Sequence, residues 1–194
     1  MAKEIVFVID CDEVIRPLIQ NMVDFYNHEF GTSMTYNDVT SINKEYKMFP
    51  LIKEDPCEWF FQKNGKDVYQ MRPPIEGSVE ALRILRKYGK VIIASNQPTN
   101  INKIWTLEWF EKYGIEYDNI FFGRGKKFIN CDFLIDDDPQ YFIGAVAKHG
   151  IFIDSIHNRN ENLQILKSQS ECKTINRFKS LKQFADYFEK YYNR

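Results

Sequence analysis

Short apolar runs recur along this chain and separate longer stretches of mixed polarity. Five of the runs are rich in β-branched and aromatic residues; they lie at 5–9, 91–94, 120–122, 133–135 and 151–153. Continuous apolar runs of this length are typical of strands that are buried on both faces, as in a parallel sheet. We therefore expect the five runs to lie in one mostly parallel sheet.

Between these runs, apolar residues recur at helical spacing. Four such patterns are bounded by residues that commonly begin or end helices, and they lie at 17–31, 79–89, 99–114 and 180–188. Pro17 suits a first helical position, and Gly31 and Gly114 suit the residue just after a helix. The alternation of strands with helices predicts a doubly wound α/β fold.

The stretch between the first and second runs breaks this alternation. It contains many aromatic residues but no strand-like run, and Asp55-Pro56-Cys57-Glu58 within it is typical of a helix start. A helical insertion is the simplest interpretation. We predict a core domain formed by 1–15 and 75–194, and a small helical cap formed by 16–74.

Composition excludes several classes of protein. With 26 basic and 27 acidic side chains among 194 residues, the net charge is −1, so no overall field attracts a nucleic-acid polymer or a membrane. The four scattered cysteines form no CxxC pair, and the N-terminal apolar run of five residues is short for a signal peptide. No segment approaches the roughly 20 apolar residues of a membrane span. We expect a cytoplasmic protein with reduced thiols, and a homodimer remains open.

Reactive side chains follow the predicted strands. The first run leads into Asp10 and Asp12, the second into Ser95 and Asn96, and the run at 133–135 into Asp136, Asp137 and Asp138, with Lys126 and Lys127 shortly before it. Ligands of open α/β sheets collect at this carboxyl edge. Several carboxylates that converge there would repel one another and would be costly to desolvate. A bound divalent cation would offset this charge, and an all-oxygen site favours Mg²⁺.

The spacing of Asp10 and Asp12 suggests a reaction. Residues two apart in an extended segment face the same side, so both carboxylates could approach one phosphoryl group. One could attack phosphorus, while the other protonates the leaving alcohol and later deprotonates water. Ser95 and a lysine could hold the phosphoryl oxygens. A pair of aspartates alone is more often a turn or a helix cap, so the functional interpretation depends on the whole ordered set.

That ordered set resembles the haloacid dehalogenase (HAD) superfamily. IDCDEVI is similar to its first motif, VIIAS to its second, Lys126 to its third and FLIDDDP to its fourth. The resemblance implies that Asp10 is the nucleophile and Asp12 the general acid and base. It also implies that Asp10, the backbone carbonyl of Asp12 and Asp137 bind Mg²⁺, with Asp136 assisting through water. Ser95, Asn96 and Lys126 would bind the phosphate.

Within the superfamily, the chain most resembles the 5′(3′)-deoxyribonucleotidases. That branch is similar in its small helical cap and in a proline-to-glycine return like that at 74–77. It also has an arginine-x-lysine triplet like Arg124-Gly125-Lys126, which favours Lys126 over Lys127. The chain departs from the branch at two positions, because Glu13 replaces a usual glycine and Asp138 replaces a common arginine.

The expected function is Mg²⁺-dependent hydrolysis of a small phosphomonoester, a (deoxy)nucleoside monophosphate, through an aspartyl phosphate. An alternative is a HAD phosphatase for a sugar phosphate or another small metabolite. A remote alternative is a non-enzymatic, receiver-like phospho-acceptor, although receivers lack an insertion after the first strand. Trp59 and Phe60 in the cap are candidate substrate contacts or simply core residues. Arg16 could reach a phosphate or form a surface salt bridge.

Overall fold

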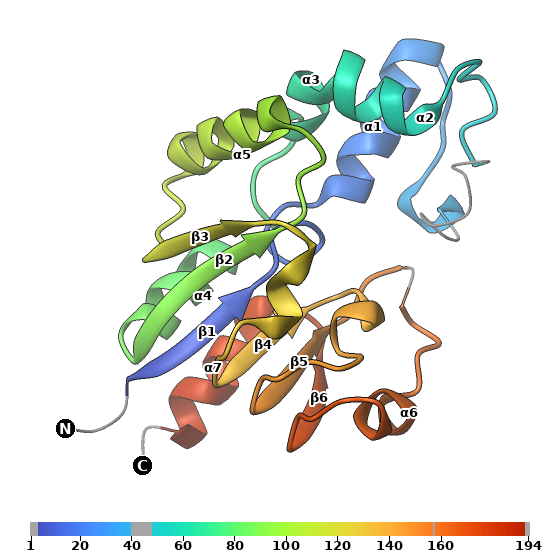
Figure 1. The fold of residues 1–194 in the computed structure, drawn as a ribbon. Coiled ribbons are helices and arrows are strands. Elements are labelled where there is room, and N and C mark those ends of the chain that lie inside the picture. The colour runs from blue at the N-terminus through green and yellow to red at the C-terminus, as the bar shows by residue number, and fades with distance from the viewer. Residues whose placement is uncertain (1–3, 40–47, 157, 193–194) are drawn as a thin grey trace.

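The computed structural model describes residues 4–39, 48–156 and 158–192. Within them, six parallel strands form one sheet in the order β3-β2-β1-β4-β5-β6 (Figure 1). The strands are β1 (Ile5–Ile9), β2 (Gly89–Ser95), β3 (Asn119–Phe122), β4 (Phe133–Asp136), β5 (His149–Ile153) and β6 (Thr174–Phe178). The expected α/β fold with a parallel sheet is therefore confirmed.

The four predicted helical patterns and the helix start at 55–58 are confirmed, whereas the helices at 65–70 and 163–168 were not predicted. The helices of the described residues are α1 (Leu18–Phe30), α2 (Pro56–Glu58), α3 (Gly65–Gln70), α4 (Ser78–Arg86), α5 (Asn100–Tyr113), α6 (Leu163–Ser168) and α7 (Leu181–Tyr192). Thr99 caps α5 by accepting a hydrogen bond from the backbone N–H of Asn102. Gly31 and Gly114 end α1 and α5 with φ of +63° and +61°, a conformation that glycine adopts without steric cost.

Both faces of the sheet are buried, as a doubly wound fold requires. On one face, Phe7 and Ile9 of β1 pack in a cluster with Leu82 of α4 and Phe188 of α7. On the other face, Val8 packs in a second cluster that includes Leu134, Phe142, Phe152 and, from α6, Leu166. Because successive strand residues face opposite sides, a strand buried on both faces must be apolar throughout. β1 meets this requirement with Ile-Val-Phe-Val-Ile.

A third apolar cluster lies in the segment between β1 and α4. Its buried members come from α1, α3, the π-helix Trp59–Lys63 and the intervening segments; they include Met22, Val23, Tyr26, Phe49, Phe60 and Val68. Figure 1 shows α1, α2 and α3 beyond the carboxyl ends of β1 and β2. The insertion thus has an apolar core of its own and lies over the edge of the sheet where ligands are expected. The exact division at residues 16 and 74 stays a prediction.

Within the described part of the chain, no helix has both the length and the apolar character needed to cross a membrane.

Candidate active site

Three carboxylates converge at the carboxyl edge of the sheet. One oxygen from each of Asp10, Asp136 and Asp137 lies within 4.8 Å of the others, and all three residues are buried. The register of the sheet explains the convergence. Ile9 is paired with Ile135 in neighbouring parallel strands, and the backbone N–H of Asp10 donates to the carbonyl of Ile135. The residues that follow Ile9 and Ile135 therefore have to be neighbours.

Lys126 lies between two of these carboxylates. Its Nζ is 2.6 Å from Oδ1 of Asp10 and 2.6 Å from Oδ2 of Asp136, and it lies 3.8 Å from the ring centre of Tyr141. The lysine belongs to the 3₁₀ helix Arg124–Phe128, which follows β3. Burial alone would lower the pKa of Lys126, but the two carboxylates outweigh burial and raise it. The amine therefore remains a charged partner of the carboxylates.

One lysine does not balance three buried carboxylates. Burial raises the pKa of Asp10 well above its usual range, although Lys126 opposes the shift. Burial likewise raises the pKa of Asp136 to about 6. Groups with such pKa values hold negative charge at a cost that a cation would offset. A set made of carboxylate oxygens suits a hard divalent cation, so the acidic cluster fits a metal ion of this class.

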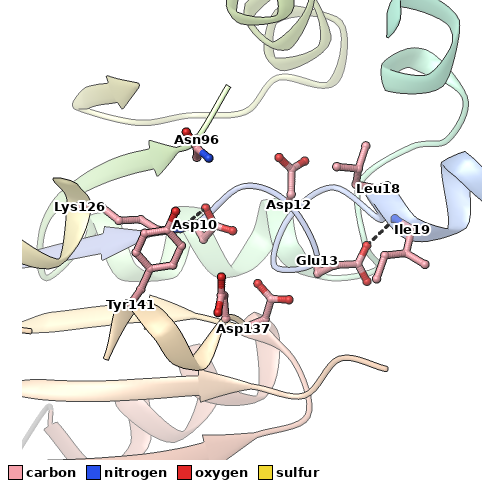
Figure 2. A pocket seen from close by; sticks show the side chains of 10 residues that line it. Asp10, Asp12, Glu13, Leu18, Ile19, Asn96, Lys126, Asp137 and Tyr141 are labelled. Carbon is pink, nitrogen blue, oxygen red and sulfur yellow. Dashed lines mark hydrogen bonds and ion pairs between the residues drawn. The ribbon is translucent and has the colours of Figure 1, made fainter. Parts of the chain in front are cut away.

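Asp12 lies apart from that cluster, on the side of the cavity toward α5. One of its oxygens, Oδ1, accepts a hydrogen bond from Nε of Arg16 at 2.7 Å. The other oxygen, Oδ2, accepts one from Nε2 of Gln97 at 3.1 Å. In the view of Figure 2, Asp12 lies above the level of Asp10 and Asp137 lies below it. The two aspartates of the first motif therefore have different partners, which permits them different chemical roles.

A cavity of about 220 Å³ opens between these groups. Polar side chains of Asp10, Asp12, Asn96, Lys126 and Asp137 line it, and Leu18 and Ile19 form an apolar wall on the side of the insertion (Figure 2). Ser95 is fully buried and does not line the cavity. Its Oγ accepts a hydrogen bond from Nε2 of Gln97 at 2.6 Å. Of the predicted phosphate-binding residues, Asn96 and Lys126 therefore line the cavity and Ser95 does not.

Comparison with known proteins shows the family of the chain. The model of the family described as 5′ nucleotidase, deoxy (pyrimidine), cytosolic type C protein (NT5C) matches residues 3–180. The chain belongs to this nucleotidase family. The resemblance to the HAD-type 5′(3′)-deoxyribonucleotidases that the motifs indicated is thereby confirmed.

A curated relative of this nucleotidase-family chain is YqfW of Bacillus subtilis (strain 168), whose name assigns it provisionally to the nucleotidases. The two are 28% identical over 112 residues, which make up 58% of this chain and 56% of YqfW. The match thus spans little more than half the length of the relative.

Solved structures share the fold over almost the whole chain. The haloacid dehalogenase-like family hydrolase SP0104 from Streptococcus pneumoniae superposes with a TM-score of 0.60 at 12% identity, covering 96% of this chain and 100% of SP0104. YfnB from Bacillus subtilis, assigned provisionally to the HAD hydrolases and solved bound to magnesium, has a TM-score of 0.52 at 8% identity, covering 96% and 98%. At these identities the likeness shows the fold alone, and it confirms the HAD-type core.

Three candidates from the sequence lie elsewhere in this nucleotidase-family chain. Arg16 is fully buried, so the expected surface salt bridge is wrong; its partner is Asp12, and it does not line the cavity. Trp59 packs against Phe25 and Phe30, and Phe60 is fully buried in the core of the insertion. Aromatic residues in a small insertion are needed to form its core, and the structure offers no support for a substrate contact by Trp59 or Phe60.

Sequence reasoning missed three polar residues at the site. Gln97 is buried and contacts both Asp12 and Ser95. Tyr141 lines the cavity and lies against Lys126. Asn158 is fully buried, and its Nδ2 donates to the backbone carbonyls of Asp137 and Ile153, which fixes the segment that carries Asp137. Gln97 and Tyr141 each lie two residues beyond the end of a motif, at Ser95 and Pro139, and these positions could have signalled a role, whereas Asn158 lies far from the four motifs.

Glu13 occupies the position where the nucleotidase branch usually has glycine, and its backbone shows why glycine is common there. Its φ is +60°, in the left-handed region that most side chains avoid. Its carboxylate makes two compensating contacts. Oε1 accepts from the backbone N–H of Ile19 at the start of α1, and Oε2 accepts from the hydroxyl of Tyr36. Tyr36 in turn accepts from the backbone N–H of Ile156, so Glu13 links the first motif to the insertion and to the segment after β5.

Replacing Tyr36 with phenylalanine should break this link while keeping the ring. The variant loses two hydrogen bonds, and we expect a decrease of about 1–3 kcal/mol in the free energy of unfolding. Urea unfolding of Tyr36→Phe and of the wild type measures the change. Tyr191→Phe, a matched substitution at an exposed position on α7, should change stability by less than about 0.5 kcal/mol. Equal stability of Tyr36→Phe and the wild type would contradict the link.

Proposed function

We propose that this protein is a Mg²⁺-dependent phosphomonoester hydrolase that acts on (deoxy)nucleoside monophosphates through an aspartyl phosphate on Asp10. The observation that carries the proposal is the convergence of carboxylate oxygens from Asp10, Asp136 and Asp137 within 4.8 Å, with Lys126 bound to the first two. Membership of the nucleotidase family supports the substrate class.

Asp10 and Asp137, together with the backbone carbonyl of Asp12, would hold the cation. Asp136 has a different environment, because its Oδ2 contacts Lys126 and its Oδ1 accepts from the backbone N–H of Asp138. With both oxygens engaged by protein groups, Asp136 suits a water-mediated role. When bound, the cation would offset the negative charge of the carboxylates and of the phosphoryl group.

The first half of the proposed reaction transfers the phosphoryl group to the protein. Oδ of Asp10 attacks phosphorus, and the bond between phosphorus and the leaving oxygen breaks. Asp12 donates a proton to that oxygen, so the product leaves as a neutral alcohol. Lys126 and Asn96 face the cavity and would hold the phosphoryl oxygens during transfer.

The second half releases inorganic phosphate. Asp12, now a carboxylate, takes a proton from water, and the water oxygen attacks phosphorus of the aspartyl phosphate. The bond between phosphorus and Asp10 breaks, which regenerates the carboxylate. Acid and base are the same residue in opposite protonation states, so the cycle closes without a further proton carrier.

A sugar phosphate remains a second candidate substrate because of the acidic residues around the cavity. Glu13 and Asp138 line it in addition to Asp10, Asp12 and Asp137. Carboxylates accept hydrogen bonds from hydroxyl groups, so a hydroxyl-rich leaving group would suit this wall. The alternative of a receiver-like phospho-acceptor loses its basis, because the chain belongs to a nucleotidase family.

Phosphate release from a panel of phosphomonoesters tests the function. With Mg²⁺ we expect nucleoside monophosphates to have the highest kcat/KM, EDTA to abolish the activity, and added Mg²⁺ to restore it, because the acidic cluster needs a cation to accept a phosphate. Sugar phosphates that exceed every nucleotide would favour the second candidate. Full activity in EDTA would contradict the metal dependence. If none of the phosphomonoesters in the panel were hydrolysed, the proposed function would be wrong.

A further inference from the structure

The amide of Gln97 joins groups that the proposed reaction uses in different ways. Its Nε2 donates to Oδ2 of Asp12 at 3.1 Å and to Oγ of Ser95 at 2.6 Å. Its Oε1 accepts from the hydroxyl of Tyr69 at 2.7 Å. An ionised carboxylate only accepts hydrogen bonds, so the amide must present its nitrogen to Asp12 and its oxygen to Tyr69. With a 5% exposed side chain, Gln97 has little freedom to change partners.

Arg16 holds the other oxygen of Asp12. Its Nε donates to Oδ1 at 2.7 Å, its Nη2 lies 2.7 Å from the same oxygen, and its Nη1 donates to Oγ1 of Thr106 at 3.2 Å. The guanidinium is fully buried and lies 4.0 Å from the ring centre of Tyr69. A planar guanidinium held on an aromatic face and bound to a hydroxyl has a fixed orientation. The two oxygens of Asp12 are therefore restrained by side chains from two different connecting segments, the one after β1 and the one after β2.

Tyr69 of α3 contacts both restraining groups. Its ring lies under Arg16, and its hydroxyl donates to Gln97. Burial raises the pKa of Tyr69, so the hydroxyl keeps its proton and remains a donor. Tyr69 thereby connects the helical insertion to the two side chains that hold Asp12, although it does not itself line the cavity.

We propose that Gln97 and Arg16 are positioning residues that orient the Asp12 carboxyl group toward the leaving oxygen, and that Tyr69 connects both of them to the insertion. The inference rests on the proposed function, in which Asp12 is the acid and base. Asp12 lines the cavity, and 21% of its side chain is exposed there, whereas its two partners are buried behind it. Misplacement of a reacting group by about 1 Å can cost roughly 100-fold in rate.

Positioning differs from a purely structural role in its dependence on the leaving group. A nucleoside alkoxide is a poor leaving group and needs a proton from Asp12 as the bond to phosphorus breaks. p-Nitrophenolate is a good leaving group and needs this proton far less. Because kcat/KM reports the steps up to departure of the leaving group, the ratio of kcat/KM for the two esters isolates the contribution of the acid. In a variant with a smaller folded fraction, kcat/KM falls by the same factor for both esters.

The experiment compares Gln97→Met, Tyr69→Phe and the wild type with Mg²⁺ on a nucleoside monophosphate and on p-nitrophenyl phosphate. Gln97→Met keeps the length of the side chain but removes the amide, and Tyr69→Phe keeps the ring under Arg16 but removes the donor to Gln97. For both variants we expect kcat/KM for the nucleotide to fall about 10-fold more than kcat/KM for the aryl ester. This is less than the roughly 10²–10⁴-fold contribution of acid–base catalysis, because Asp12 itself remains. Gln62→Met, at an exposed position in the insertion, should leave the ratio unchanged.

Equal losses on the two esters, or no loss on either, would overturn the positioning inference and leave the proposed function intact. If Gln97→Met does not fold, the ratio for Tyr69→Phe decides the question alone. A wild-type protein that hydrolyses neither ester would overturn the proposed function and this inference with it. The wild-type measurement therefore distinguishes failure of the positioning inference from failure of the proposed function.

Discussion

Replacing Asp10 with asparagine is expected to reduce turnover by roughly 10⁴-fold or more, as loss of a covalent nucleophile does. The amide has the shape of the carboxyl group but does not attack phosphorus. We expect the fold to persist, because the substitution removes one charge from a crowded cluster and leaves Lys126 paired with Asp136. Phosphate release with Mg²⁺ and a saturating nucleoside monophosphate measures the loss.

Asp67→Asn provides the matched control, since Asp67 is exposed on α3 and should tolerate the same change without loss of activity. Thermal unfolding of both variants separates loss of chemistry from loss of structure. Turnover of a folded Asp10→Asn protein near the wild-type value would remove Asp10 from the role of nucleophile.

Replacing Lys126 with methionine should produce the largest loss of stability. The amine is 2% exposed and lies between Asp10 and Asp136, so its removal leaves buried carboxylates without their cation. Breaking a buried ion pair on one side costs about 3–5 kcal/mol. Urea unfolding without Mg²⁺ measures this loss, and saturating Mg²⁺ should restore part of the stability because it binds the folded state.

Lys127→Met is the control for this prediction, because Lys127 is the next residue along the chain. Its Nζ donates to the backbone carbonyl of Ile143 at an exposed position. We expect a change of less than about 1 kcal/mol in this variant. If Lys126→Met and Lys127→Met were equally stable, the ion pairs at the cluster would have no net stabilising role.

The strands that sequence analysis found all contain a continuous apolar run, including β3 at one edge of the sheet. β6 (Thr174–Phe178), at the other edge, was missed. Its residues Thr-Ile-Asn-Arg-Phe mix polar and apolar types, so the chain carries no continuous apolar run there. The helix ends at Gly31 and Gly114 were predictable because they depend on local backbone conformation.

The carboxylate cluster was predictable for a different reason. In a parallel sheet, residues that directly follow adjacent strands have to converge, so Asp10, Asp136 and Asp137 could be brought together from their position after apolar runs. The burial of Arg16 was not predictable in this way. It depends on Tyr69 of α3 and Thr106 of α5 meeting around one guanidinium, and their spacing in the sequence carries no sign of that. Gln97 and Asp12 follow the adjacent strands β2 and β1, so their contact agrees with the same convergence.

Crystals grown with Mg²⁺ and beryllofluoride would test the central claim most directly, because beryllofluoride mimics a phosphoryl group on a carboxylate. We expect beryllium bonded to one oxygen of Asp10 and a single Mg²⁺ about 2.1 Å from oxygens of Asp10 and Asp137. Beryllofluoride bound to another residue, or Mg²⁺ bound away from both aspartates, would contradict it.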